Sequence, residues 1–119
     1  MGSPDDDYPY AAETFTLLGN RRRLLLIKFL ALFEAGTSLE VREIARFVRG
    51  AETNTPPRLV STDDYESAYN GLIQTHLPKL AIADVIEYDD RAKEVIVTRR
   101  VKQYAGICSL VECISMCNE

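Results

Sequence analysis

Three arginines at helical spacing are the side chains of this sequence best suited to binding an anion. In LEVREIARFVRG, residues 39–50, Arg42, Arg46 and Arg49 occupy positions i, i+4 and i+7, so a helix presents all three on one face. Three guanidinium groups on one face can contact successive phosphate oxygens of a nucleic acid. The alternative, which the pattern favours equally, is a solvated arginine face paired with Glu43 and neighbouring acids.

A second group of cations belongs to a predicted hairpin. The β-rich runs VIEY and EVIVTRRV are joined by the charged turn DDRAK, a pattern typical of two paired strands. We expect Arg91 and Lys93 at the tip, and Arg99 and Arg100 on the second strand, where all four would contact a nucleic-acid backbone or minor groove. Protection of an edge strand is the alternative role, but five cations within residues 91–102 favour binding.

Polar side chains on the helix before the hairpin are the candidates for base contacts. From Tyr65 onward, apolar residues recur at helical spacing, and the opposite face carries side chains that can hydrogen-bond to bases. These side chains are Ser67, Asn70, Gln74 and Thr75. Lys79 is the only cation on this helix, and Glu66 would repel phosphate groups. The alternative is an ordinary exposed face, on which Asn and Gln are common.

The sequence contains no motif for catalysis or for metal binding. His76 is the single histidine, and we expect it to pack beside the apolar face with one ring nitrogen hydrogen-bonded. Cys113 and Cys117 could share a metal or oxidise between subunits, but we expect them and Cys108 to be buried thiols of a dimer helix. Without a glycine-rich phosphate loop or a nucleophile motif, we expect neither an enzyme nor a bound metal or cofactor.

Length and charge narrow the class of protein. The chain has 119 residues, 46% hydrophobic and 27% charged, which suits one globular domain. Its net charge of −4 conceals two basic regions, residues 21–49 and 91–102, and local potential decides contacts with anions. No signal peptide or membrane-spanning run is present, and the cysteines are odd in number, so we expect a cytoplasmic protein.

Capping residues and apolar spacing predict the helices. A short helix is expected to end at Gly19, and Asn20 then caps a second one over residues 21–33. Because this second helix is apolar on nearly every side, it is either the central helix of the domain or half of a dimer interface. We expect it to end at Gly36. TSLE, residues 37–40, is a capping-box pattern for a third helix, which Gly50 should end.

The second half of the chain is predicted to combine a connector, a long helix, the hairpin and a final helix. The connector contains Pro56 and Pro57, and its RLV segment is expected to pair briefly as a strand. Ser61 or Thr62 caps the long helix, which Pro78 should kink or distort. The final helix is expected within residues 104–119.

After the short first helix, the order helix, helix, helix, hairpin, helix predicts an α+β, mainly helical fold. It fits a winged helix-turn-helix with a β-hairpin wing and a C-terminal helix. We expect a disordered acidic tail over residues 1–11, the winged helix-turn-helix domain over 12–101, and a C-terminal helix over 102–119 that forms dimers.

Two segments resemble known regulators. LLGNRRRLLLIKFL resembles the first core helix of ArsR-like winged-helix regulators, and LIQTHLPKLAIADVIEYDD resembles the end of their recognition helix and first wing strand. Around THLPKL the chain is also similar to a family of winged-helix domains of halophilic archaea, over roughly residues 14–98. The resemblance implies a cytoplasmic, dimeric transcription-regulator fold. A connector of about a dozen residues departs from the 3–4-residue turn of a compact helix-turn-helix.

The sequence therefore predicts a small transcription regulator that binds double-stranded DNA and no membrane. We expect it to form a homodimer through its first core helix, residues 21–33, and its last helix. The alternative is a winged-helix module that binds another protein and no DNA. Residues 52–90 support this alternative because they carry eight acids against Arg58 and Lys79: Glu52, Asp63, Asp64, Glu66, Asp84, Glu87, Asp89 and Asp90.

Overall fold

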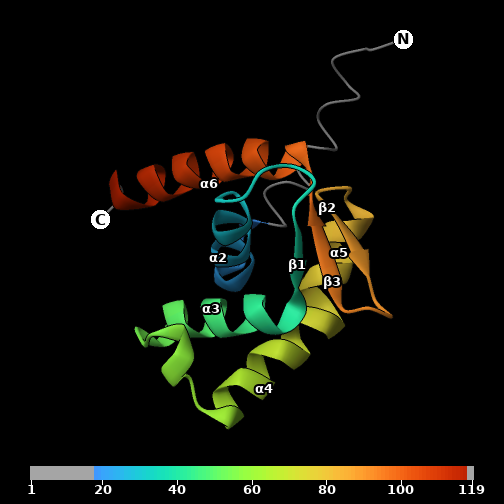
Figure 1. Ribbon diagram of the computed structural model, residues 1–119. Helices are drawn as coiled ribbons and strands as arrows, with labels where there is room; N and C mark the ends of the chain where they lie inside the picture. The colour runs from blue at the N-terminus through green and yellow to red at the C-terminus, as the bar shows by residue number, and fades with distance from the viewer. Residues whose placement is uncertain (1–17, 118–119) are drawn as a thin grey trace.

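The computed structural model describes residues 18–117, with side chains from residue 18 to 108. The described chain is an α+β domain, mainly helical, with one small antiparallel sheet, as expected (Figure 1). The elements in chain order are α2 (Arg21–Leu30), β1 (Ser38–Glu40), α3 (Val41–Thr53), η2 (Pro57–Leu59), α4 (Thr62–Gly71), η3 (Leu72–His76), α5 (Leu77–Ile82), β2 (Ile86–Asp89), β3 (Glu94–Val97) and α6 (Arg99–Cys117). The predicted tail, residues 1–11, and most of the predicted short helix before Gly19 lie outside the described residues.

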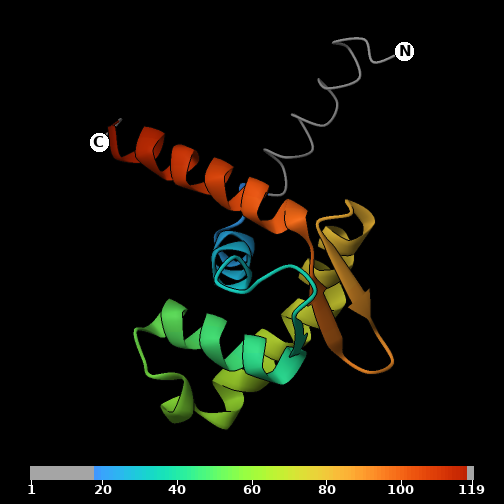
Figure 2. The same cartoon turned by 45° about the horizontal axis from the view of Figure 1, so that its top comes forward.

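Helix α2 is the central helix of the domain. The side chain of Asn20 accepts a hydrogen bond from the Arg23 backbone N–H at 3.1 Å, which confirms the predicted cap. The helix lies between α6 on one side and α3 on the other (Figures 1 and 2). It ends at Leu30, whereas Gly36 adopts φ +96° in the turn before β1, so the prediction that Gly36 ends this helix is wrong.

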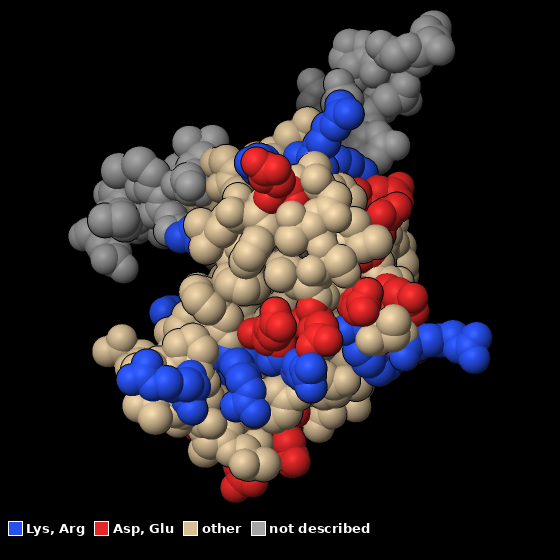
Figure 3. Space-filling model, viewed as in Figure 1, with Lys and Arg blue, Asp and Glu red and all other residues tan. Residues whose placement is uncertain are grey.

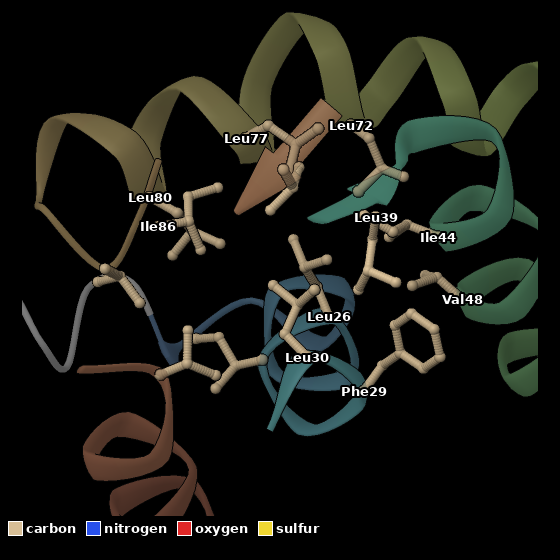
Figure 4. Packing of buried hydrophobic residues seen from close by; sticks show 14 of the residues in the cluster. Leu26, Phe29, Leu30, Leu39, Ile44, Val48, Leu72, Leu77, Leu80 and Ile86 are labelled. Atoms are coloured by element: carbon tan, nitrogen blue, oxygen red, sulfur yellow. The ribbon is translucent and has the colours of Figure 1, made fainter. Parts of the chain in front are cut away.

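The hydrophobic core forms where α2 meets α3, the sheet and the α4–α5 segment. Leu26 and Leu30 of α2 point toward Leu39, Ile44 and the leucines of the α4–α5 segment (Figure 4). All of these side chains are buried. Burial of each contributes roughly 1.5–3 kcal/mol to folding, so this core holds the helices that carry the candidate site in place.

The sheet has the strand order β1–β3–β2, and both pairings are antiparallel. The predicted hairpin is confirmed as β2–β3. The predicted capping box at TSLE is wrong, because Ser38–Glu40 form β1 and the Glu40 side chain makes no capping hydrogen bond. Pairing with β3 satisfies the backbone groups of this segment while Leu39 becomes buried, which a capping box would not achieve.

Helix α6 begins earlier than predicted. Thr98 accepts a hydrogen bond from the Arg100 backbone N–H at 3.2 Å and donates one to the Val85 carbonyl, so it caps the helix and ends the strand. The prediction that Arg99 and Arg100 lie on the second strand is therefore wrong.

Helix α3 continues through Gly50 and ends at Thr53, contrary to prediction. The terminating residue is Asn54, which adopts the left-handed conformation at φ 53°. Gly50 is required for another reason, since a Cβ there would lie 2.5 Å from the Thr55 carbonyl oxygen. The RLV segment is also not a strand: Pro57–Leu59 form a 3-10 helix.

The long helix is distorted before Pro78. The Ser61 side chain caps α4 by accepting from the Asp64 backbone N–H, as predicted. The helix then widens into the π-helical segment η3, and Pro78 lies in the first turn of α5. Because proline lacks an N–H and its ring collides with the carbonyl four residues earlier, a regular α-helix cannot pass through this position.

The first half of α6 belongs to the same core as the rest of the domain. Val101, Tyr104 and Cys108 are buried in the core cluster, so the predicted boundary between residues 101 and 102 falls inside this helix. The second half extends beyond α2 (Figure 2). Among the described residues, no helix combines the length and apolar character needed to cross a membrane.

Candidate nucleic-acid interface

The three arginines of α3 differ in their surroundings. Arg42 forms an exposed ion pair with Glu40 at 2.5 Å, and the Arg46 guanidinium lies 4.6 Å above the Tyr65 ring. Arg49 is only partly exposed and contacts Asp64 at 2.8 Å. Arg42 and Arg46 therefore lie at the surface, whereas Arg49 joins α3 to the start of α4.

Arg49 is one member of a charged network that links three helices. Glu52 accepts two hydrogen bonds from Arg22, both 2.8 Å long, and lies 3.4 Å from Arg49. Although burial raises the pKa of Glu52, the hydrogen bonds from Arg22 and Arg49 outweigh it and hold this pKa below its ordinary value. The network fixes α2, α3 and α4 against one another. Arg49 therefore holds these helices in position.

The hairpin tip is held in one shape by its own acids. The Asp89 carboxylate accepts hydrogen bonds from the backbone N–H groups of Arg91 and Ala92, both at 3.0 Å. Asp90 accepts from the Lys93 Nζ at 2.8 Å and from the Tyr88 hydroxyl at 3.0 Å. The Lys93 contact is the main reason that the pKa of Asp90 is lowered.

A groove lies between the start of α3, the face of α4 and the hairpin tip. We call it the α3–hairpin groove; it has a volume of about 330 Å³ and is lined by Glu40, Arg42, Tyr65, Tyr69, Ala92 and Lys93. The Val41 backbone N–H donates to the Lys93 carbonyl at 2.9 Å, which ties the two sides together. The groove thus brings together two cations, Arg42 and Lys93, that the sequence separates by fifty residues.

The predicted base-contacting side chains lie on the exposed surface of the long helix. Ser67 and Asn70 are exposed on α4, Gln74 and Thr75 on η3, and Lys79 on α5. Glu66, which is expected to repel phosphate groups, is exposed on α4 as well, and so is Asp63. The structure therefore presents both the hydrogen-bonding face and its acidic beginning to solvent.

Lys and Arg side chains gather in a row on this face of the molecule. Figure 3 shows the row crossing the surface over α3 and continuing toward the β2–β3 hairpin. Acidic side chains lie directly beside it, and more lie at the start of α4. The basic surface is thus a band and not a broad patch.

Arg99 and Arg100 lie at the other end of the hairpin from its tip. Arg100 donates to the Ala83 carbonyl at 3.0 Å and to the Tyr104 hydroxyl at 3.3 Å, and its guanidinium lies 5.6 Å from the Tyr104 ring centroid. Arg100 therefore fixes α6 to the turn after α5. Arg99 is exposed on the first turn of α6.

His76 is buried, as predicted, and its Nδ1 lies 3.4 Å from a guanidinium nitrogen of Arg23. Because a guanidinium only donates, this Nδ1 accepts and the ring is neutral. Burial, followed by the positive charge of Arg23, lowers the pKa of His76 to about 4. Cys108 is buried in the core, whereas the side chains of Cys113 and Cys117 lie outside the described residues. Over residues 18–108, no group of three potential ligands is placed to hold a metal.

Sequence reasoning missed Glu40, Asp90 and the two tyrosines as parts of the site. Tyr65 and Tyr69 pack against the core as members of the predicted apolar stripe, and they also line the groove, with their ring centroids 5.7 Å apart. Glu40 was assigned to a capping box and Asp90 to a turn. A usable signal existed for Asp90, since an acid three residues before a lysine at a hairpin tip is placed to pair with it.

The chain belongs to a protein family defined by a domain of unknown function, DUF7344, whose model matches residues 15–96. Neither the curated proteins nor the solved structures contain a match to this chain.

Proposed function

We propose that this domain is a DNA-binding transcription regulator of the winged helix-turn-helix type. The helix order and the β1–β3–β2 sheet support this architecture, in which α4 and α5 carry the recognition helix and β2–β3 is the wing. The proposal includes the relationship to ArsR-like and haloarchaeal winged-helix proteins, and a cytoplasmic location.

The observation that carries the proposal is the meeting of cations from two elements at one groove. Cations of α3 and of the hairpin tip border the α3–hairpin groove or lie beside it, and the long helix that contributes Tyr65 and Tyr69 to this groove exposes its hydrogen-bonding side chains to solvent. A duplex needs this combination, because cations position the phosphates while amide and hydroxyl groups meet the base edges.

The residues divide into three roles under this proposal. Phosphate contacts come from Arg42 and Arg46 on α3 and from Arg91 and Lys93 at the hairpin tip. Base contacts come from Ser67, Asn70, Gln74 and Thr75, with Lys79 adding a cation beside them. Arg49 and Arg100 act indirectly, because their ion pairs and hydrogen bonds fix the elements that carry the contacts.

The proposal also includes a homodimer formed through α2 and α6. Residues 107–117, ICSLVECISMC, contain a single charged residue, and this part of α6 extends beyond α2 (Figure 2). A helix of this composition is typically buried on more than one face, and a second copy of the chain would supply the additional face. Sedimentation velocity across a concentration series should give a dimer; a monomer at every concentration would contradict this part of the proposal.

A second candidate function, binding of another protein, is favoured by the acids around α4 and on the sheet. The solvent face of the sheet carries Glu40, Glu87, Asp89 and Glu94, and α4 begins with Asp63 and Asp64. These surfaces would attract a basic protein and repel DNA.

The proposal is tested by the binding of the full chain to duplex DNA from its own upstream region across a salt series. Binding should be saturable and weaken with salt, and Arg46→Ala or Arg91→Ala should each make the salt slope about one unit shallower. Lys102→Ala removes an exposed cation from α6 and serves as the matched control, with an unchanged slope. Absence of duplex binding at low salt would overturn the proposal in favour of a protein partner.

A further inference from the structure

We infer that the α3–hairpin groove binds one phosphodiester group, and that Glu40 and Asp90 occupy its cations until that group replaces them. This inference rests on the proposed function for the identity of the ligand, the backbone of DNA. It adds a defined phosphate site and a built-in competitor for it.

The groove has the size and chemistry for a phosphate. Arg42 of α3 and Lys93 of the hairpin tip both line it, together with Tyr65 and Tyr69 of α4. Its volume of about 330 Å³ is many times the roughly 30 Å³ that one water molecule occupies in the liquid. Guanidinium, ammonium and phenol groups all donate hydrogen bonds to phosphate oxygens.

Both cations of the groove carry a carboxylate in the described structure. Arg42 lies 2.5 Å from Glu40, and Lys93 lies 2.8 Å from Asp90. Two positive and two negative charges leave the site neutral, so an incoming phosphate must displace the carboxylates. The exposed fraction of the side chain is 69% for Arg42 and 73% for Asp90, and ion pairs this exposed are weak enough to exchange.

Strand register explains why Glu40 returns to Arg42 in the absence of ligand. Glu40, Glu94 and Asp89 stand directly opposite one another across β1, β3 and β2. Like charges directly opposite on one sheet face repel, so this row favours a Glu40 side chain turned toward Arg42. The repulsion stabilises the ligand-free pairing without blocking its exchange.

Only side chains need to move when the carboxylates are displaced. The backbone on both sides of the groove is held by the Val41-to-Lys93 hydrogen bond and by the Asp89 carboxylate at the hairpin tip. Arg46 is held beside the groove by its contact with Tyr65. A rigid frame with exchangeable carboxylates therefore makes Glu40 and Asp90 determinants of phosphate affinity.

The test removes the two competitors without changing their size. Glu40→Gln and Asp90→Asn should each tighten binding of the duplex by roughly two- to fivefold, the range expected for releasing an exposed ion pair. Glu87→Gln removes a charge from the same sheet face without lining the groove, and it should tighten binding less. Arg42→Ala and Lys93→Ala should each weaken binding.

A second measurement separates this inference from the proposed function. Titration of the full chain with inorganic phosphate at constant ionic strength, followed by amide NMR shifts, should give saturable shifts at Arg42, Ala92 and Lys93, and at lower phosphate concentration in Glu40→Gln. If Glu40→Gln and Glu87→Gln have equal affinities for the duplex, the groove inference is overturned and DNA binding is left standing. The same holds if the amide shifts caused by phosphate are absent or lie elsewhere in the chain. Groove shifts without duplex binding would support the groove and overturn DNA binding.

Discussion

At the scale of single residues, side chains with equivalent helical spacing differ in the residues that they contact. Arg42, Arg46 and Arg49 share a helix face, but Arg49 forms an ion pair with Asp64 at the start of α4. Arg46 stacks on Tyr65, and Arg42 pairs with Glu40, both at the surface. Helical periodicity predicts the face correctly; which neighbour covers which part of it depends on the other elements.

His76 makes the stability of the domain depend on pH. Its folded-state pKa of about 4 lies below its ordinary value of 6.5, so the unfolded chain binds more protons between these pH values. The stabilising contribution is complete above pH 6.5 and is lost as pH falls through 4. The free energy of unfolding measured in urea should decrease by roughly 2 kcal/mol over this window. This is less than the pKa difference alone would give, because the ring keeps some exposure to solvent.

The matched variant for this prediction is His76→Gln, which keeps a hydrogen-bonding side chain and removes the titration. Its unfolding free energy should change little between pH 6.5 and about 4.5, although it is lower overall than that of the parent chain. An identical pH dependence in the two proteins would show that other groups are responsible, among them Glu52, whose pKa is also lowered.

At the scale of elements, two glycines in helices should respond oppositely to alanine. Gly50 lies inside α3 where a Cβ would approach the Thr55 carbonyl oxygen to 2.5 Å, whereas a Cβ at Gly106 in α6 meets nothing within 4 Å. Gly106→Ala should therefore stabilise the domain by up to about 1 kcal/mol, the difference in helix propensity. Gly50→Ala should destabilise it, because the connector must shift. Thermal unfolding of both variants would show this, and a stabilised Gly50→Ala would contradict the steric role.

The contact between α2 and α3 depends on Glu52. Glu52→Ala leaves Arg22 and Arg49 without their shared carboxylate, which is largely buried, so unfolding free energy should fall by roughly 1–2 kcal/mol. Glu40→Gln breaks an exposed pair and should leave the urea midpoint unchanged, which also keeps it usable in the binding test. Equal effects of the two variants would mean that the Glu52 network contributes no more to the free energy of unfolding than a surface ion pair does.

At the scale of the whole molecule, α6 and the rest of the domain should unfold as one unit. Val101 is fully buried in the cluster that contains the leucines of α2. Val101→Ala should lower the unfolding free energy by roughly 2 kcal/mol through lost burial and an added cavity, whereas Lys102→Ala, one residue later and exposed, should have no effect. Circular dichroism and tyrosine fluorescence should report one shared transition; separate transitions would restore a boundary near residue 101.

Most of the element order could be predicted from the sequence, because apolar spacing and caps act locally. Asn20 and Ser61 cap the helices as expected, the hairpin joins strands at DDRAK, and Pro78 accompanies a distortion. The fold class follows from these signals. They persist in the structure because each satisfies backbone hydrogen bonds within a few residues.

Two of the errors share one physical cause, which is a competing contact with a distant residue. Residues 38–40 of the predicted capping box pair with β3 instead. Arg99 and Arg100 lie in α6 and not in the strand, because Thr98 caps this helix. The helix packs against α2, and Arg100 contacts the turn after α5. None of these partners is local, so no local pattern reveals them.

Local patterns along the chain are thus enough to predict most of the helices, the hairpin and the types of side chain available for binding anions and bases. Which of these side chains meet depends on how the core packs: the packing brings Arg42 and Lys93 to one groove, gives each a carboxylate partner and engages Arg49 and Arg100 in contacts between elements. The physical reason is range. Capping and periodicity act over a few residues, whereas ion pairs and grooves form between surfaces that packing of the core brings together.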